Sequence, residues 1–468
     1  MSNHPFDSSG HDPLEEFLKK LREQGFDPNA MNGAQAFDAD ALRKMGLPLD
    51  PAMFSGIFAQ VNSMMNAQSS DEPVNWDLAQ QNARQVLALG KDPSITSSQT
   101  GAVRDAAALA DLWLDPVTIF ERPAFSVEAW SKAEWVENSF ATWKEIAGPV
   151  ATEVTSAMNA SIQQQLPEEL SGMLGGGNIF AGLGGMMFGM QMGQAIGKLA
   201  EEIVSSTDIG IPLAQGRSAL LPGGVAAFSE GLEIPAQEVI LYLAVREATL
   251  IRLHKANPWL REDIIGLIQR FSRGIRVDIE RMQASAQEID FDPANPEAMM
   301  EVFAGDMFAP QHTEDQQLAL DRLETLLALI EGWVSLITEQ ATKNLPMAPQ
   351  LSESMARRRA TGGPAEHAFA QLVGLELRPR KMREALAFWR HYEEQHGFEA
   401  RDQLWQGPET LPTSEDLDDP EGFASRRALL TASQDEFDAA LEKLLAGGYD
   451  QPDEEPGESS EGGGSPKA

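Results

Sequence analysis

The sequence contains no cysteine, and this absence excludes several kinds of chemistry at once. Without a thiol, the chain cannot form a disulfide, use a thiolate nucleophile or hold an iron–sulfur cluster through cysteine. Residues 1–6 also lack the basic segment followed by an apolar one that opens a secretory signal. Both observations fit the reducing cytoplasm, which is the localisation we expect.

Basic residues are scarce as well, with 36 Lys and Arg against 71 Asp and Glu, giving a formal net charge of −35. Such a charge repels the phosphates of nucleic acids and the anionic surface of a membrane. We therefore expect neither a nucleic acid nor a membrane as a partner. Hydrophobic residues still make up 42% of the 468 residues, which is enough for a substantial core.

One segment approaches a long apolar run, residues 179–196, which carry no charge. Two glutamines and five glycines make it less hydrophobic than a typical membrane span. Glycines recur here at every fourth position: Gly185, Gly189, Gly193 and Gly197. On a helix they form one smooth stripe along which a second helix can approach closely. We interpret the segment as a buried core helix.

Apolar residues follow helical spacing from about residue 75 onward, so we predict an all-α or nearly all-α fold. Residues 1–70 are expected to be a loosely ordered leader, 71–446 a helical domain and 447–468 a disordered acidic tail. Residues 209–222 are the best place for a short strand or an extended loop. The expected helices cover 76–89, 102–114, 127–143, 150–165, the glycine stripe to about 204, 235–254, 262–286, 317–343, 364–373, 381–396 and 435–445.

The helix expected from Pro235 contains the sequence Arg246-Glu247-Ala-Thr-Leu250, and Pro258-Trp-Leu follows it. This stretch resembles the zinc helix of a zincin-like family that is common in actinobacteria and described as hydrolases or zinc-dependent metalloproteases. In the zincin pattern His-Glu-x-x-His, the two histidines bind zinc and the glutamate acts as general base. The resemblance implies a mostly helical, zincin-like core over about residues 75–445.

Further stretches along the chain are similar to the same family and occur in the same order. They cover residues 111–114, 130–136, 216–222, 331–334, 372–380 and 404–412. None of them is decisive alone, but their shared order makes the family assignment fairly specific.

The two positions of the zinc-binding histidines are occupied by Arg246 and Leu250. Neither a guanidinium nor a methyl group can donate a lone pair to zinc. Glu247 remains as a vestigial general base, and the resemblance implies that a later carboxylate, here Glu331, completed the metal site. We therefore expect no metal and no other cofactor in this chain, although complete family members hold zinc.

Glu331 stands in a stretch, residues 326–337, that is otherwise almost entirely apolar. An ionised carboxylate in such surroundings needs a cation, or it takes up a proton. In complete members zinc would supply the positive charge, and we hypothesise that Arg246 does so here by pairing with Glu331, Glu247 or both. The alternative is that Glu331 reaches solvent at the edge of its helix.

A basic cluster stands out from the acidic background: Arg357, Arg358, Arg359, Arg378, Arg380, Lys381 and Arg383. It could bind a phosphate-bearing ligand or an acidic partner. We favour the alternative that these residues pair with carboxylates of the chain itself, as surface charges commonly do. His254 is interpreted as an ordinary surface or capping histidine.

Two functions remain open. The first is a catalytically inactive zincin-like protein that binds or scaffolds an unknown protein or peptide partner. The second is an active metallohydrolase or peptidase that uses an unrecognised metal site, or Glu247 as base with another electrophile. The family description favours the second, and the residues at 246 and 250 favour the first. The sequence is also compatible with an oligomer.

Overall fold

The computed structural model describes residues 74–90, 92–165, 178–274, 312–360, 368–370, 372, 375 and 380–431. The chain divides into two units, Met1–Asp71 and Glu72–Ala468, and all described residues belong to the second. The predicted leader, the predicted acidic tail and the helix expected at 435–445 lie outside the described residues.

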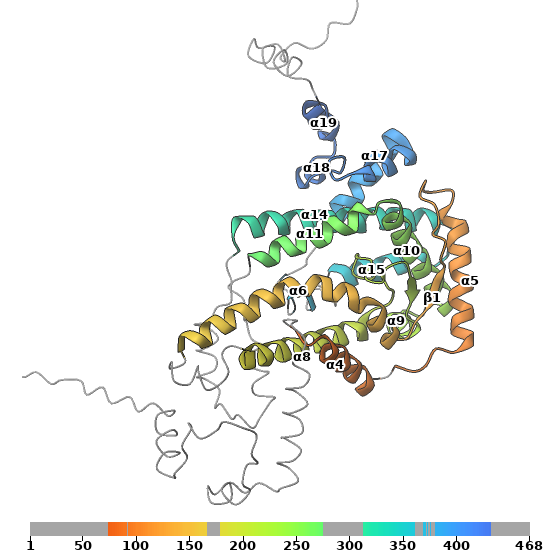
Figure 1. Cartoon of the computed structure of the whole chain (residues 1–468). Coiled ribbons are helices and arrows are strands. Elements are labelled where there is room, and N and C mark those ends of the chain that lie inside the picture. The colour runs from red at the N-terminus through yellow and green to blue at the C-terminus, as the bar shows by residue number, and fades with distance from the viewer. Residues whose placement is uncertain are drawn as a thin grey trace, which may run out of the picture. The chain divides into compact units, whose positions relative to one another are not determined.

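The described residues form mainly helices, which confirms the predicted fold class (Figure 1). Two short strands, β1 (Val127–Ala129) and β2 (Ser218–Leu220), pair in parallel. The helices are α4 (Trp76–Leu89), α5 (Ser97–Leu114), α6 (Lys132–Gln165), α8 (Asn178–Glu202), α9 (Pro222–Ser229), α10 (Ala236–Ala256), α11 (Trp259–Arg273), α14 (Glu314–Ala341), α15 (Ala348–Ala360), α17 (Met382–Gln403), η2 (Leu404–Gln406, a 3-10 turn), α18 (Ser414–Asp418) and α19 (Phe423–Thr431).

Local sequence signals account for three helix starts, which lie within three residues of the predicted ones. α14 begins after a capping box, in which Thr313 accepts from the backbone N–H of Gln316 and the Gln316 side chain accepts from Thr313 N. α10 begins directly after Pro235, and α4 has its predicted bounds, with Asn75 capping its first turn.

The region from residue 127 to 165 differs from the prediction of two helices. Residues 127–129 are strand β1, and α6 then continues as one helix through Pro149. β1 forms because Val127 lies opposite Ser218, a partner that no local pattern reveals. Proline removes one helical hydrogen bond, but Ile146 and Val150 beside it are fully buried and hold the helix against the core. The extended segment expected at 209–222 contains β2, as predicted.

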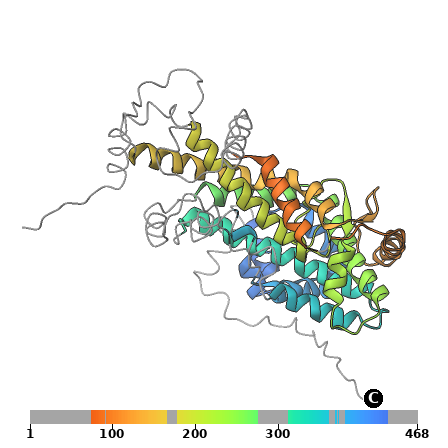
Figure 2. The ribbon, with the colours of Figure 1, turned by 90° about the horizontal axis from the view of Figure 1, so that it is seen from below.

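The glycine stripe of α8 packs against α4 of the same chain (Figures 1 and 2). Asn75 N donates a hydrogen bond to Gly185 O, at 3.2 Å. A Cβ on Gly189 would lie 2.7 Å from Asn75 O, and one on Gly193 would lie 2.3 Å from Ala79 O. The predicted buried helix is therefore confirmed, and the sequence had left open that its partner lies within the chain. In the part of the chain that the structure describes, no helix meets the length and apolarity of a membrane span.

α10 and α14, the helices that carry Arg246 and Glu331, lie side by side, as the hypothesised pair requires. α10 also contacts α5, α15 and both strands, and nearly all of its residues from Val239 to His254 are buried. Tryptophan fills much of the surrounding core: Trp130, Trp135, Trp143, Trp333, Trp389 and Trp405 are all buried. The motif helix α10 therefore lies in the protein interior, where its side chains are closely packed.

We predict that Gly193→Val destabilises the protein by about 1–3 kcal/mol, because the added side chain would overlap the backbone of α4. Urea unfolding followed by circular dichroism measures the change. Gly266→Ala in α11 is the matched control, since a Cβ there meets no atom within 4 Å and stability should be kept or raised. Equal effects of the two substitutions would contradict the close packing.

Candidate functional site

The three motif positions on α10 are all in the protein interior. Arg246 is 5% exposed, Glu247 is 1% exposed and Leu250 is 2% exposed. Leu250 belongs to the continuous hydrophobic core and contributes no donor atom. The two charged residues, in contrast, must find partners within the protein, because an unpaired buried charge is strongly unfavourable.

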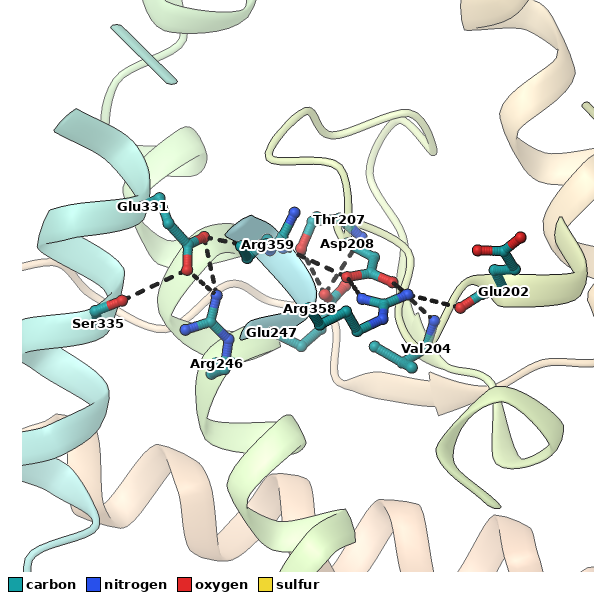
Figure 3. A network of polar contacts seen from close by, with 10 residues as sticks. All are labelled: Glu202, Val204, Thr207, Asp208, Arg246, Glu247, Glu331, Ser335, Arg358 and Arg359. Atoms are coloured by element: carbon teal, nitrogen blue, oxygen red, sulfur yellow. Dashed lines mark hydrogen bonds and ion pairs between the residues drawn. The ribbon is translucent and has the colours of Figure 1, made fainter. Parts of the chain in front are cut away.

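Arg246 pairs with Glu331 on α14 (Figure 3). Its Nη2 lies 2.7 Å from Glu331 Oε1 and 2.9 Å from Oε2, and Ser335 Oγ donates to Oε1 at 3.4 Å. Burial alone would raise the pKa of Glu331, but the positive charges of Arg246 and Arg359 outweigh it and lower that pKa. The hypothesised pair with Glu331 is confirmed. The alternative of a solvent-reaching Glu331 is wrong, since its side chain is only 13% exposed.

Glu247 is bound by hydroxyl and amide donors of the strand β2 and of the loop between α8 and β2. Ser206 Oγ and Ser218 Oγ, the latter at 2.8 Å, donate to Oε1. Thr207 donates to Oε2 through both Oγ1, at 2.5 Å, and its backbone N–H, at 3.3 Å. A carboxylate offers about four lone-pair positions, so these bonds occupy all of them. Sequence reasoning missed the three donor residues, because nothing near them in the chain marks them as partners of Glu247.

Asp208 continues the network on the same loop (Figure 3). Arg358 binds it through two hydrogen bonds, with Nη1 2.8 Å from Oδ1 and Nη2 2.8 Å from Oδ2. Val204 N donates to Oδ2 at 3.0 Å, and Arg359 Nη2 donates to Oδ1 at 3.3 Å. Burial would raise the pKa of Asp208, but the two guanidinium groups lower it to about 2. Asp208 is therefore ionised at neutral pH.

Arg359 joins the two halves of this buried network, since its Nε also lies 3.8 Å from Glu331 Oε2. Positive and negative side chains alternate along the network in the order Arg246, Glu331, Arg359, Asp208, Arg358. Burial lowers the pKa of the Arg359 guanidinium, partly offset by the two carboxylates. The network connects α10, α14, α15 and the loop that precedes β2.

The basic cluster predicted from the sequence pairs largely with carboxylates of the chain, as we favoured. Further pairs join Arg357 to Glu353, Arg380 to Glu324 and Lys381 to Asp418. The expectation that these would all be surface charges is wrong for Arg358 and Arg359, whose side chains are 19% and 16% exposed. Arg378 lies outside the described residues.

His254 is a core residue, so the expectation of a surface or capping histidine is wrong. Its Nε2 lies 3.3 Å from Gly210 O, while Nδ1 is buried without a hydrogen-bond partner. Burial lowers the pKa of His254 to about 4, so the imidazole is neutral at physiological pH. No local pattern indicates this burial, because the histidine lies in the last, charged turn of α10.

We predict that Arg246→Met lowers the free energy of unfolding by about 3–5 kcal/mol, because it removes the nearest cation from the buried Glu331. Combining it with Glu331→Leu should restore much of that loss, since no unpaired charge remains. Urea unfolding of the single and double variants gives the coupling. Arg84→Met is the control: Arg84 pairs with Glu137 at 2.6 Å, but both side chains are about half exposed, and it should cost less than about 1 kcal/mol. An Arg246→Met cost no larger than the control's would contradict a buried pair.

Comparison with known structures supports the fold. A crystal structure described as that of a proposed hydrolase with a novel fold, from Chloroflexus aurantiacus, superimposes with a TM-score of 0.53. The match covers 77% of this chain and 100% of that chain at 18% sequence identity, a level that relates the folds only. No curated protein sequence matches the chain.

A family model described as zincin-like metallopeptidase matches residues 74–424. This family implies zinc, so the expectation of no cofactor is wrong at the level of the family. The residues that the resemblance assigns to the motif do not fit that ion: one is a guanidinium, one is aliphatic, and the lone pairs of Glu247 are all engaged. Among the described residues, no group of three or more His, Asp or Glu is placed to hold a metal. Because the family model matches most of the chain, this protein belongs to the zincin-like metallopeptidase family.

Proposed function

We propose that this protein acts by binding and that the former zinc motif carries no peptidase chemistry. In this proposal the motif helix α10 is a structural element, and the protein serves as a binding or scaffold member of its family. Its partner would be a protein or peptide in the cytoplasm. The net charge of −35 argues against nucleic acid or an anionic membrane surface in that role.

The hydrogen bonding of Glu247 is the observation that carries the proposal. A general base needs a free lone pair within hydrogen-bond reach of the proton that it removes. Four donors from Ser206, Thr207 and Ser218 already occupy the carboxylate, and the residue is 1% exposed. Glu247 would have to break at least one of these bonds and meet water before it could act as a base.

The position of Arg246 supports the same proposal. A zinc ion in this family acts as a Lewis acid and also neutralises nearby carboxylates. Arg246 reproduces the second role, because its guanidinium sits against Glu331 at 2.7 Å. It cannot perform the first, since a guanidinium is permanently protonated and has no coordination site for a substrate oxygen.

An assay of peptide hydrolysis tests the proposal directly. Purified protein should cleave no member of a mixed peptide library above background, and Glu247→Gln should leave that result unchanged. Glu353→Gln, an exposed glutamate on α15, is the matched control for loss of one negative charge. Cleavage by the natural sequence that Glu247→Gln abolishes and Glu353→Gln preserves would overturn the proposal in favour of an active hydrolase.

A further inference from the structure

α15 carries the two arginines that complete the buried network, yet few of its apolar side chains are buried against the rest of the protein. Between Ala348 and Arg359, the well-buried side chains are those of Leu351, at 0% exposure, Met355, at 2%, and the alanine at its start. Segments with few buried apolar contacts open locally at a lower free energy than the core does. By this measure α15 differs from its neighbours α10 and α14, which are buried along most of their length.

Polar contacts attach both ends of α15. Near its start, Met347 N donates to Glu238 Oε2 at 3.0 Å, and Gln350 Nε2 donates to Leu232 O at 3.1 Å. In its last turn, Arg358 binds Asp208 through two hydrogen bonds and also donates to Glu202 O at 2.7 Å. The two bonds to Asp208 join oppositely charged groups in a bidentate pair, so they are stronger than the contacts at the start, in which at most one group is charged.

The stretch of α10 beneath α15 is the one that carries the altered motif. Burial raises the pKa of Tyr242 on α10, and the nearby Arg246 and the Ser352 hydroxyl on α15 partly offset that effect. Two turns beyond Ser352 on α15, Arg359 reaches Glu331, the partner of Arg246 (Figure 3). Removal of α15 would therefore uncover the tyrosine and the Arg246–Glu331 pair together.

We propose that α15 opens as a unit while the rest of the bundle stays folded. The ion pairs of Arg358 and Arg359 hold it closed. Opening moves Asp208 from two guanidinium partners to water and exposes the motif face of α10. A partner that binds this face gains access only in the open form. The opening of α15 does not depend on whether the face carries out chemistry, so this proposal is independent of the proposed function.

Hydrogen exchange of the full chain, followed by mass spectrometry, tests whether the ion pairs of Arg358 and Arg359 hold α15 closed. Arg358→Gln with Arg359→Gln should make the amides of residues 348–360 exchange at least about tenfold faster, because charge-assisted hydrogen bonds are lost. The amides of α10 should stay protected. Arg357→Gln, on the same turn but 76% exposed, is the control and should match the natural sequence. Unchanged exchange in α15, or equal loss of protection in α15 and α10, would overturn the proposal that α15 opens separately.

The absence of cysteine allows a second test in a chain that keeps Arg358 and Arg359. Met355→Cys places a thiol on the buried side of α15, and Val334→Cys places one in the core of α14. Under native conditions a thiol reagent should modify position 355 at least about tenfold faster than position 334, because only local opening is needed there. Equal rates at the two positions would show that α15 opens only on global unfolding, and the proposal would fail.

Discussion

A carboxylate taken out of water needs a cation or a full set of hydrogen-bond donors, and three carboxylates at the centre of this protein face that requirement. Glu247 receives four hydrogen bonds from neutral donors, Glu331 receives a guanidinium, and Asp208 receives two guanidinium groups and a backbone N–H. The carboxylates and their donors lie on α10, α14, α15, β2 and the loop before β2. Satisfying the three carboxylates therefore fixes how these five segments lie against one another.

In the proposed function, the family fold is kept while the electrostatics at its centre differ from those of the zincin pattern. In the zincin pattern, a metal ion supplies positive charge to the carboxylates around it. Here Arg246 supplies a permanent positive charge to Glu331, and we propose that it does so from the position of the first histidine. The pair thus places a positive charge beside Glu331 between the two helices. Membership of the zincin-like metallopeptidase family therefore describes the architecture, and the chemistry has to be judged from the site.

Features with a local signal could be predicted from the sequence. The capping pair Thr313 and Gln316 marks the start of α14, and the four-residue glycine spacing marks a close helix contact. The Arg246–Glu331 pair was also predictable, because one carboxylate in an apolar stretch demands a partner. In each case the physical reason for the feature can be inferred from a few residues of one helix.

The features that were missed depend on contacts between distant segments. β1 exists because Val127 meets Ser218, and Glu247 is satisfied by a loop about forty residues away. The burial of Arg358 depends on Asp208, at a sequence separation of 150 residues. A short basic run has the same appearance in a sequence whether it faces solvent or enters a core. Only the packing of the helices decides between the two.

The central claim is that Glu247 is retained for structure, and the free energy of unfolding of Glu247→Gln measures it most directly. A residue kept for chemistry is often neutral or costly for stability, so replacing it leaves stability unchanged or raises it. The hydrogen bonds of Glu247 predict the opposite: an amide in place of the carboxylate would set N–H groups against the donors of Thr207 and the two serines. We predict a loss of about 1–3 kcal/mol in urea unfolding. A variant as stable as the natural sequence, or more stable, would contradict the account.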